Sequence, residues 1–282
     1  MQSVLFNKVS TVFCAHIEEL AEQIVRLQPE LAAHDSQALP AKVAALMGWL
    51  DDRFVKMAID ASAGQIEVED TIEKSVLERA GYFESFAVDR LVQCSEGKVY
   101  PPAACYQCYP RLSEFELAER GLWTCIAVCG RKEEETGMGR LRNFYMREIV
   151  LLGSSNWVRE ERGRWMEKIS DFARALGLQA EVDSASDPFF GTDATRGRKL
   201  VQQLKELKFE MQVRIGRPAA RLAIASFNLH ERFFAKRFGL QLPGGADAYT
   251  GCVAFGLERW ALALVAELGT FRAFNLAEGI LA

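Results

Sequence analysis

The sequence predicts an α+β domain built on an antiparallel sheet, preceded by a short helical region. Three observations indicate this. Segments with the alternating pattern of strands follow one another through short links in the second half of the chain, as in hairpins. Helical periodicities are segregated from these strands instead of alternating with them. Neither G-x-x-x-x-G-K-[ST] nor G-x-G-x-x-G, the phosphate loops of parallel α/β proteins, occurs in the sequence.

The N-terminal part of the chain has helical periodicity. Apolar residues recur three and four positions apart over 9–28 and 41–60, and the pattern continues over 67–80. A polar connection that ends in a proline separates the first two segments. These segments predict amphipathic helices.

This pattern divides the chain into a helical N-terminal region, 1–80, and a main domain, 81–282. Nothing in the first region indicates chemistry. Its two histidines, His16 and His34, are isolated from other candidate ligands, so we expect them at surface or capping positions. The region also has no long heptad pattern, so we expect no coiled-coil arm.

The main domain alternates between strands and segregated helices. Strands with one apolar face and one polar face are expected, with Lys208 and Glu210 on the polar face of theirs. In chain order the expected elements are a hairpin of 122–133 and 140–153 joined by "EETGMG", a helix at 156–177 ending at a glycine, strands at 207–215 and 221–228, and a buried helix at 253–269.

Composition excludes several classes of protein. The 282 residues are 49% hydrophobic and 26% charged, as in a folded protein, and the net charge of −4 provides no global basic field for nucleic acid. No apolar run is long enough to span a bilayer, and the N-terminus lacks the pattern of a secretory signal. Seven cysteines, an odd number, predict reduced thiols in a cytoplasmic protein, some of which could bind metal.

The predicted hairpin gathers chemically useful side chains on one face. Alternation places two thiols, two arginines, two carboxylates and an aromatic ring together. A solvated charged face is the plain alternative, but the aromatic residue among the charges argues against it. The residues are Cys125, Cys129, Arg131 and Glu133 on the first strand, and Arg142, Phe144 and Glu148 on the second.

Two further motifs each allow more than one interpretation. "GLERW" places Glu258 and Arg259 at the start of an otherwise apolar helix, where an exposed helix end is the plain interpretation and a phosphate-binding arginine is the other. "PPAACYQCYP" contains Cys105 and Cys108 in a C-x-x-C, which could be half of a zinc knuckle, a redox pair, or neither.

These motifs together resemble those of class II aminoacyl-tRNA synthetases. "GRKEEETGMGRLRNF" resembles their motif 2, "GLERW" resembles their motif 3, and "SFNLHERFFAKRFG" between them is similar to seryl-tRNA synthetases. The resemblance covers residues 100–270. A class II core without a tRNA-reading arm looks like the amino acid:[carrier protein] ligases, which are homologues of seryl-tRNA synthetases. "RLRNFYMREIV", "SDPFFG" and "TGCVAFGLERW" also fit that family.

The resemblance implies one zinc ion per chain with three protein ligands, Cys105, Glu148 and Cys252, and an open fourth position. Such an open position is typical of a functional zinc site. Cys108 is then a packed or spare thiol. A closed four-sulfur site is the alternative, formed by Cys105, Cys108, Cys125 and Cys129.

The resemblance also implies an ATP site. Arg131 would hold the α-phosphate and Arg259 the γ-phosphate, while Phe144 stacks on adenine and Glu133 accepts from its amino group. Glu133 and Glu148 would also contact the amino acid. Mg²⁺ would accompany ATP, with ligands that the sequence does not assign. The remaining residues expected at the nucleotide are Arg140, Leu141, Lys208, Ala223, Ile224, Ala225 and Ser226.

The implied reaction activates glycine or alanine as an aminoacyl-adenylate and transfers it to the phosphopantetheine thiol of a carrier protein. A helix expected over 195–207 opens with the basic residues Arg196, Arg198 and Lys199, which would either receive the acidic carrier or form a solvated helix face. A homodimer is expected, as for class II cores, with an interface near 81–99.

Two other functions compete with this one. The chain could be a seryl-tRNA synthetase-like ligase or paralogue acting on tRNA, although its acidity and the missing arm argue against this. It could instead be a catalytically silent class II-like binding protein, but Arg131, Glu133 and Arg259 are all in place.

Overall fold

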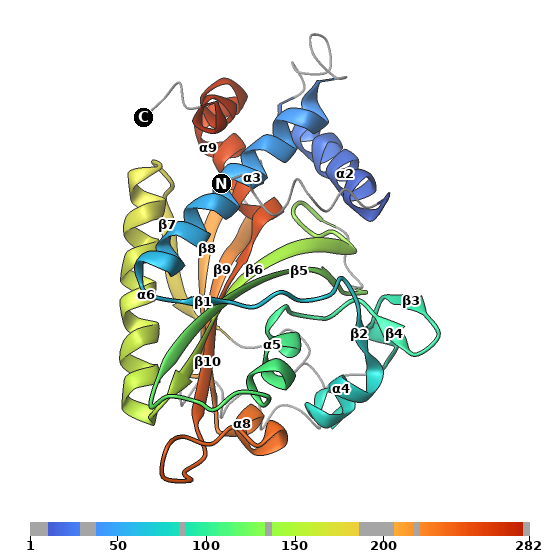
Figure 1. The fold of residues 1–282 in the computed structure, drawn as a ribbon. Coiled ribbons are helices and arrows are strands. Elements are labelled where there is room, and N and C mark those ends of the chain that lie inside the picture. The colour runs from blue at the N-terminus through green and yellow to red at the C-terminus, as the bar shows by residue number, and fades with distance from the viewer. Residues whose placement is uncertain are drawn as a thin grey trace.

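The protein is built on one large antiparallel sheet covered by helices on both faces (Figure 1). The computed structural model describes residues 11–28, 38–84, 88–132, 137–185, 206–216 and 220–278. In spatial order the strands of this sheet are β1 (Gly64–Gln65), β5 (Gly121–Gly130), β6 (Asn143–Gly153), β10 (Tyr249–Gly256), β9 (Ala220–Glu231), β8 (Lys208–Ile215) and β7 (Ala180–Ser184). Among these described strands, only β1 runs parallel to its neighbour, β5.

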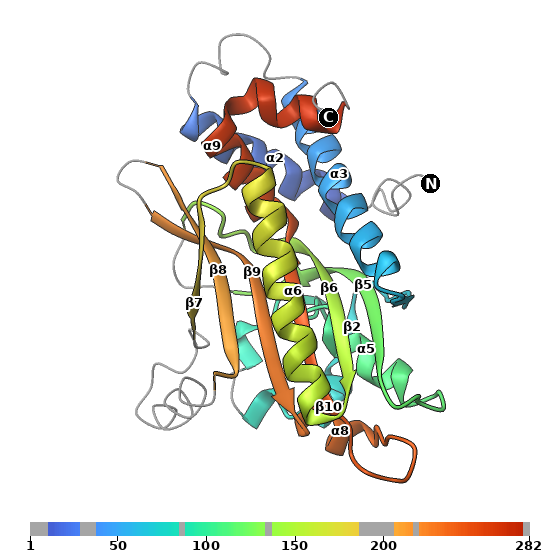
Figure 2. The same cartoon turned by 90° about the vertical axis from the view of Figure 1, so that its left-hand side faces the viewer.

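The described helices lie in two layers. On one side α6 runs along the sheet, and α2, α3 and α9 gather near one end of it (Figure 2). On the other side lie α4, α5 and α8 with a small sheet, β2-β4-β3. Their bounds are α2 (Thr11–Leu27), α3 (Leu39–Asp60), α4 (Lys74–Arg79), α5 (Cys105–Leu112), α6 (Ser155–Ala175), α8 (Phe233–Phe238), α9 (Leu257–Ala277), β2 (Ile72–Glu73), β3 (Gln93–Ser95) and β4 (Lys98–Val99), with short 3₁₀ turns at Tyr82–Glu84 and Val88–Arg90.

Period-two alternation on the central strands separates two cores. On β6, Tyr145 and Ile149 pack into the main core with α2, α3, α6 and α9. Met146 and Val150 face the opposite way, into a second core with α5 and α8. The same alternation on β10 directs Val253 to the first core and the neighbouring small residues to the second. The second face is therefore the one that holds the cysteines and the candidate site.

Most of the expected elements are present. The hairpin of β5 and β6 is antiparallel, and its register pairs Cys125 with Glu148 and Cys129 with Phe144, as the alternation predicts. Helix α6 begins with a cap in which Ser154 Oγ accepts from Trp157 N, and it is followed by Gly177 at φ 83°. None of the helices in the described ranges combines the length and apolar character needed to cross a bilayer.

Three expectations were wrong. The helical pattern over 67–80 yields only a two-residue strand and the short helix α4. The buried helix expected over 253–269 begins at Leu257, because the apolar residues before it form the end of β10. His16 is not on the surface: it is 4% exposed and lies 3.4 Å from Glu258 Oε1. His34 lies outside the described residues.

The N-terminal helices pack into the same core as the sheet. Residues of α2 and α3, among them Leu20 and Phe54, join the core beneath α9, and β1 adds an edge strand. The proposed boundary at residue 80 stays a prediction.

A buried ion pair ties α3 to the central strand β6. Arg147 donates from Nε and Nη2 to the two carboxylate oxygens of Asp51 at 2.6 and 2.8 Å, and the two side chains are 4% and 1% exposed. Arg147 Nη1 also donates to Thr124 Oγ1 at 3.4 Å. Bidentate geometry of this kind offsets the desolvation of both charges.

Replacing Asp51 by alanine should destabilise the protein by about 3–5 kcal/mol, because it leaves the Arg147 guanidinium buried without its counter-charge. Urea denaturation of the two proteins measures this. The matched control is Asp60→Ala on the same helix, which breaks the exposed Lys56–Asp60 pair and should cost less than about 1 kcal/mol. Equal losses in the two variants would contradict the role assigned to the buried pair.

Candidate functional site

Two adjoining cavities open on the second face of the sheet. The smaller is lined by the β5–β6 connection, β8, β9 and the start of α9, and the larger, of about 400 Å³, extends toward α5. Arg131, Lys208, Ser226 and Arg259 line both cavities, so the two form one continuous cleft. A molecule with two ends of different chemistry could therefore bind along it.

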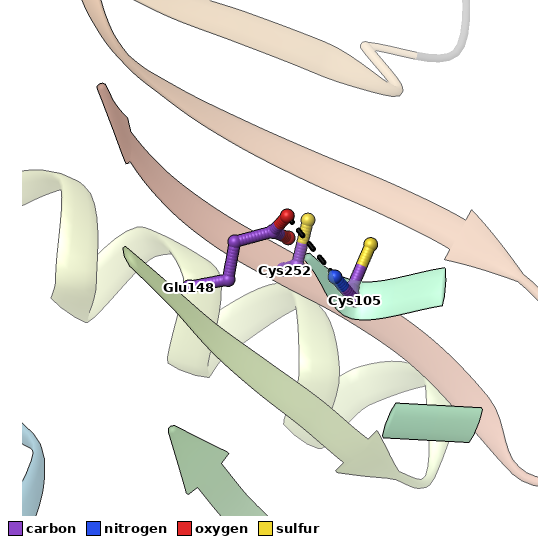
Figure 3. A group of neighbouring side chains, drawn as sticks. All are labelled: Cys105, Glu148 and Cys252. Atoms are coloured by element: carbon purple, nitrogen blue, oxygen red, sulfur yellow. Dashed lines mark hydrogen bonds between the residues drawn. The ribbon is translucent and has the colours of Figure 1, made fainter. Parts of the chain in front are cut away.

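One end of the cleft is formed by Cys105, Glu148 and Cys252, which converge from α5, β6 and β10 (Figure 3). One potential ligand atom of each lies within 4.8 Å of the others. Glu148 Oε1 accepts from the backbone N of Cys105 at 3.1 Å, which fixes the carboxylate, while Oε2 accepts no hydrogen bond from the described residues. All three residues are buried.

The electrostatics of this group favour a cation. Burial raises the pKa of Glu148. The pKa of Cys105 is raised well above its ordinary value, first by its hydrogen bond to Cys252, then by burial and by the nearby Glu148 carboxylate. Each acidic group therefore disfavours ionisation of the others, and a divalent cation would reverse this by stabilising all three anionic forms. Two sulfurs and a buried carboxylate with one unused oxygen fit such an ion.

The four-sulfur alternative is not assembled in the described part of the chain, where Cys105, Glu148 and Cys252 are the metal-sized group that the side chains form. Cys108 Sγ instead donates to Cys125 Sγ at 3.1 Å, and both thiols are buried. Burial raises the pKa of Cys129 well above its ordinary value, as expected for a packed, protonated thiol.

Sequence reasoning missed the residues that support this end of the cleft. Asn228 Nδ2 lies 3.4 Å from Cys252 Sγ, and His230 Nε2 lies 3.8 Å from the same sulfur. His230 Nδ1 in turn contacts the Tyr109 hydroxyl at 3.0 Å. The signal was available in "SFNLH", where alternation along a strand places Asn228 and His230 on one face.

The other end of the cleft carries two arginines. Arg131 donates from Nε to Pro102 O at 2.8 Å, and its guanidinium lies 5.3 Å from the centre of the Phe144 ring. Arg259 donates from Nε to Gly139 O at 2.9 Å and from Nη1 to Ala223 O at 3.2 Å. Backbone carbonyls thus hold both guanidinium groups at the cavity wall, which suits the recognition of a polyanion.

The remaining expected residues fall into three groups. Lys208 lines the cleft and pairs with Glu210 at 3.1 Å, and both lie on the polar face predicted for β8. Glu133 and the three basic residues Arg196, Arg198 and Lys199 lie outside the described residues. Those that line one or both cavities as expected are Arg140, Leu141, Phe144, Ala223, Ile224, Ala225 and Ser226.

Glu258 is a buried carboxyl at the end of the cleft that carries Arg131 and Arg259. Its Oε1 accepts from Tyr145 N at 2.7 Å and lies 3.4 Å from His16 Nε2, while Arg259 follows it in the chain. Its Oε2 is buried and accepts no hydrogen bond within the described residues. Burial raises the pKa of Glu258 to about 8, and the hydrogen bond from Tyr145 opposes this.

This raised pKa predicts a pH dependence of stability. The folded state holds the Glu258 proton more tightly than the unfolded state, so the contribution is largest below about pH 4.5 and is lost as the pH rises toward 8. In the wild-type protein the free energy of unfolding should fall between about pH 4.5 and pH 8. Glu258→Gln should make this fall smaller by a few kcal/mol, because each pKa unit corresponds to about 1.4 kcal/mol.

Urea denaturation at a series of pH values measures this dependence. The comparison should be repeated in the His16→Gln background, so that the facing histidine cannot contribute to the measured pH dependence. If Glu258→Gln leaves the shape of the pH curve unchanged in that background, the Glu258 carboxyl is ionised throughout and the prediction is wrong.

The chain is similar to known proteins at two levels of sequence identity. No protein-family model matches the chain. Amino acid--[acyl-carrier-protein] ligase 1 of Bradyrhizobium diazoefficiens is 40% identical over 174 residues, which are 61% of this chain and 53% of that protein. The chain spans about half the length of the curated acyl-carrier-protein ligases that it matches.

More distant matches are seryl-tRNA synthetases. The type-2 serine--tRNA ligase of Methanocaldococcus jannaschii is 26% identical over 136 residues, or 47% of this chain and 26% of that protein. The solved structure of M. kandleri SerRS, in complex with A. aeolicus tRNASec, has a TM-score of 0.66 at 21% identity and covers 81% of this chain and 52% of that chain. The chain therefore has the fold of class II aminoacyl-tRNA synthetases and is a homologue of the amino acid--[acyl-carrier-protein] ligases.

Proposed function

We propose that this protein activates glycine or alanine with ATP and transfers the aminoacyl group to the phosphopantetheine thiol of a carrier protein. One observation carries the proposal: a single cleft joins two backbone-held arginines at one end to a cation-binding group at the other. This arrangement suits a substrate pair with phosphates at one end and an amino group at the other. The names of the matched relatives support the coarser part of the proposal, the joining of an amino acid to an acyl-carrier protein.

The first half-reaction is the attack of the amino acid carboxylate on the α-phosphorus of ATP, with loss of pyrophosphate. It needs little covalent chemistry from the protein, so positioning and charge neutralisation are what the chain provides. In the proposal Arg131 holds the α-phosphate and Arg259 the γ-phosphate. Phe144 stacks on adenine, the backbone of Ala223–Ser226 lines the base pocket, and Mg²⁺ accompanies ATP.

Zinc is the metal we propose for Cys105, Glu148 and Cys252. Two thiolates and a carboxylate suit this borderline-soft ion, and three protein ligands leave a position for substrate. When bound, zinc supplies a Lewis-acid site for the amino group of the substrate. This would explain how a small amino acid with little side chain is selected, since its amino group is then the main feature that a site can recognise.

Cys252→Ser should therefore lose the metal. Purified wild-type protein should contain about one zinc per chain, whereas the Cys252→Ser protein should contain little, because a hydroxyl is a far weaker ligand than a thiolate. Elemental analysis by mass spectrometry measures this. Cys108→Ser is the matched control, since its thiol hydrogen-bonds to Cys125, and it should keep its zinc. Loss of zinc from the Cys108 variant, with retention in the other, would favour the four-sulfur site.

The second half-reaction is the attack of the pantetheine thiol on the carbonyl carbon of the adenylate. A thioester forms, AMP leaves, and the thiol proton passes to solvent or to AMP. We include in the proposal the docking of an acidic carrier by Arg196, Arg198 and Lys199, a homodimer, and a cytoplasmic setting. The cysteines whose side chains the structure describes are all free, which is compatible with such a reducing setting.

The decisive experiment is ATP–pyrophosphate exchange with each proteinogenic amino acid, followed by mass spectrometry of candidate carriers and of tRNA. Exchange with glycine or alanine and a mass gain on a phosphopantetheine-bearing carrier are the expected results. Exchange without any carrier product, but with aminoacylated tRNA, would support the alternative that the match to serine--tRNA ligases suggests. If no amino acid supports exchange, the proposed activity is wrong, and the result favours the alternative of a catalytically silent binding protein.

Arg131→Ala should abolish exchange while the protein still folds and binds zinc. Loss of a charge-assisted contact that strengthens in the transition state costs about 3–4 kcal/mol, or more than a hundredfold in rate. Arg142→Ala, which replaces an exposed arginine on the same hairpin connection, is the matched control and should retain exchange. Activity of the Arg131 variant within about tenfold of wild type would exclude the role proposed for it.

A further inference from the structure

The N-terminal helix α2 reaches the nucleotide end of the cleft. Gln23, which is 5% exposed, accepts through Oε1 a hydrogen bond of 2.8 Å from the backbone N of Gly139. The two residues are 116 positions apart in the sequence. A buried side-chain acceptor is thus used to fix one peptide of the β5–β6 connection, the segment that resembles motif 2.

Gly139, held by Gln23, in turn hydrogen-bonds to Arg259. Its carbonyl accepts from Arg259 Nε at 2.9 Å, so the same residue is held by Gln23 on its N–H and holds Arg259 with its C=O. Gly139 has φ 72°, and a Cβ there would lie 2.5 Å from Leu222 Cδ1. Glycine is therefore required for this backbone conformation and this close packing.

A second contact from α2 lies seven residues earlier, on the same helix face. His16 Nε2 lies 3.4 Å from Glu258 Oε1, directly before Arg259. At the end of α2, Gln28 donates from Nε2 to Val265 O and accepts from Thr270 N, on either side of the non-helical Gly269 in α9. The helix thus holds α9 at its first turn and at its break, with the Gln23 contact between them.

We propose that Gln23 is a positioning residue for Arg259: through Gly139 it fixes the direction in which the guanidinium enters the cleft. The inference rests on the proposed function, in which Arg259 binds the γ-phosphate of ATP. Gln23 itself touches no substrate. Its effect should therefore depend on whether the nucleotide carries the phosphate that Arg259 binds.

A structural role alone predicts something different. Leu20 and Ile24 of α2 are fully buried in the main core, so any loosening of the helix lowers stability. Such loosening would weaken the binding of all nucleotides alike, or of none. The contact chain from Gln23 through Gly139 predicts a loss restricted to ATP.

Calorimetric titration of the full chain with ATP and with AMP separates these roles. Gln23→Met keeps the length of the side chain but removes its acceptor, and we expect ATP to bind about tenfold more weakly while AMP binding changes less than about twofold. Gln28→Met is the matched control, since it removes an amide from the residue that directly follows the same helix and does not contact Gly139, and it should leave the ATP-to-AMP ratio unchanged. If Gln23→Met fails to fold, Gln23→Asn withdraws the same carbonyl and should give the same pattern.

A double variant with Arg259→Ala tests whether Gln23 acts through Arg259. In that background Gln23→Met should have no further effect on ATP binding, because the group it positions is gone. Additive losses would overturn the inference, as would equal effects of the Gln23 and Gln28 variants on the ratio. If Arg259→Ala weakens ATP binding but Gln23→Met does not, the inference alone is wrong. If Arg259→Ala leaves ATP binding unchanged, the proposed function of Arg259 is wrong as well.

Discussion

The ion pair between Asp51 and Arg147 determines which side of the sheet can hold chemistry. Arg147 and Glu148 are neighbours on β6, so alternation directs one into the helical core and the other into the cleft. A slip of one residue in the register of β6 would reverse them and bury an unpaired carboxylate under α3. Arg147 donates hydrogen bonds to both carboxylate oxygens of Asp51, so the observed register of β6 is strongly favoured. In this register Glu148 lies beside Cys105 and Cys252.

The two ends of the cleft have opposite electrostatic character, and strand order explains why they are close. β6 and β10 are adjacent, which brings Glu148 beside Cys252, while Arg131 and Arg259 extend from the connection before β6 and from the helix after β10. The same pair of strands therefore carries the acidic residues Glu148 and Cys252 along its length, and the two arginines lie where the pair begins and ends. In the proposed function, a substrate that spans the cleft would meet the Cys105, Glu148 and Cys252 group and the two arginines at a separation that the sheet fixes.

Local patterns predicted the parts of this structure that depend on short-range rules. The facing of the hairpin residues and the polar face of β8 follow from alternation, and the end of helix α6 follows from Gly177. The resemblance to class II enzymes added the Cys–Glu–Cys group. The start of α9 was predicted wrongly because the apolar residues of a buried strand and of a buried helix look alike, and α9 follows directly after Gly256, the last residue of β10. His16 and Gln23 could not be assigned, since their partners lie more than a hundred residues away.

The role of α2 shows why a helix without chemical motifs can still matter for a site. Its apolar residues join the main core, while Gln23 within it and Gln28 directly after it hydrogen-bond to backbone groups of the β5–β6 connection and of α9. Each of these backbone groups belongs to a glycine or lies near one, where the chain is least able to hold its own conformation. These contacts therefore restrain the chain next to its glycines, and the Gln23 contact does so at Gly139, whose carbonyl accepts from Arg259.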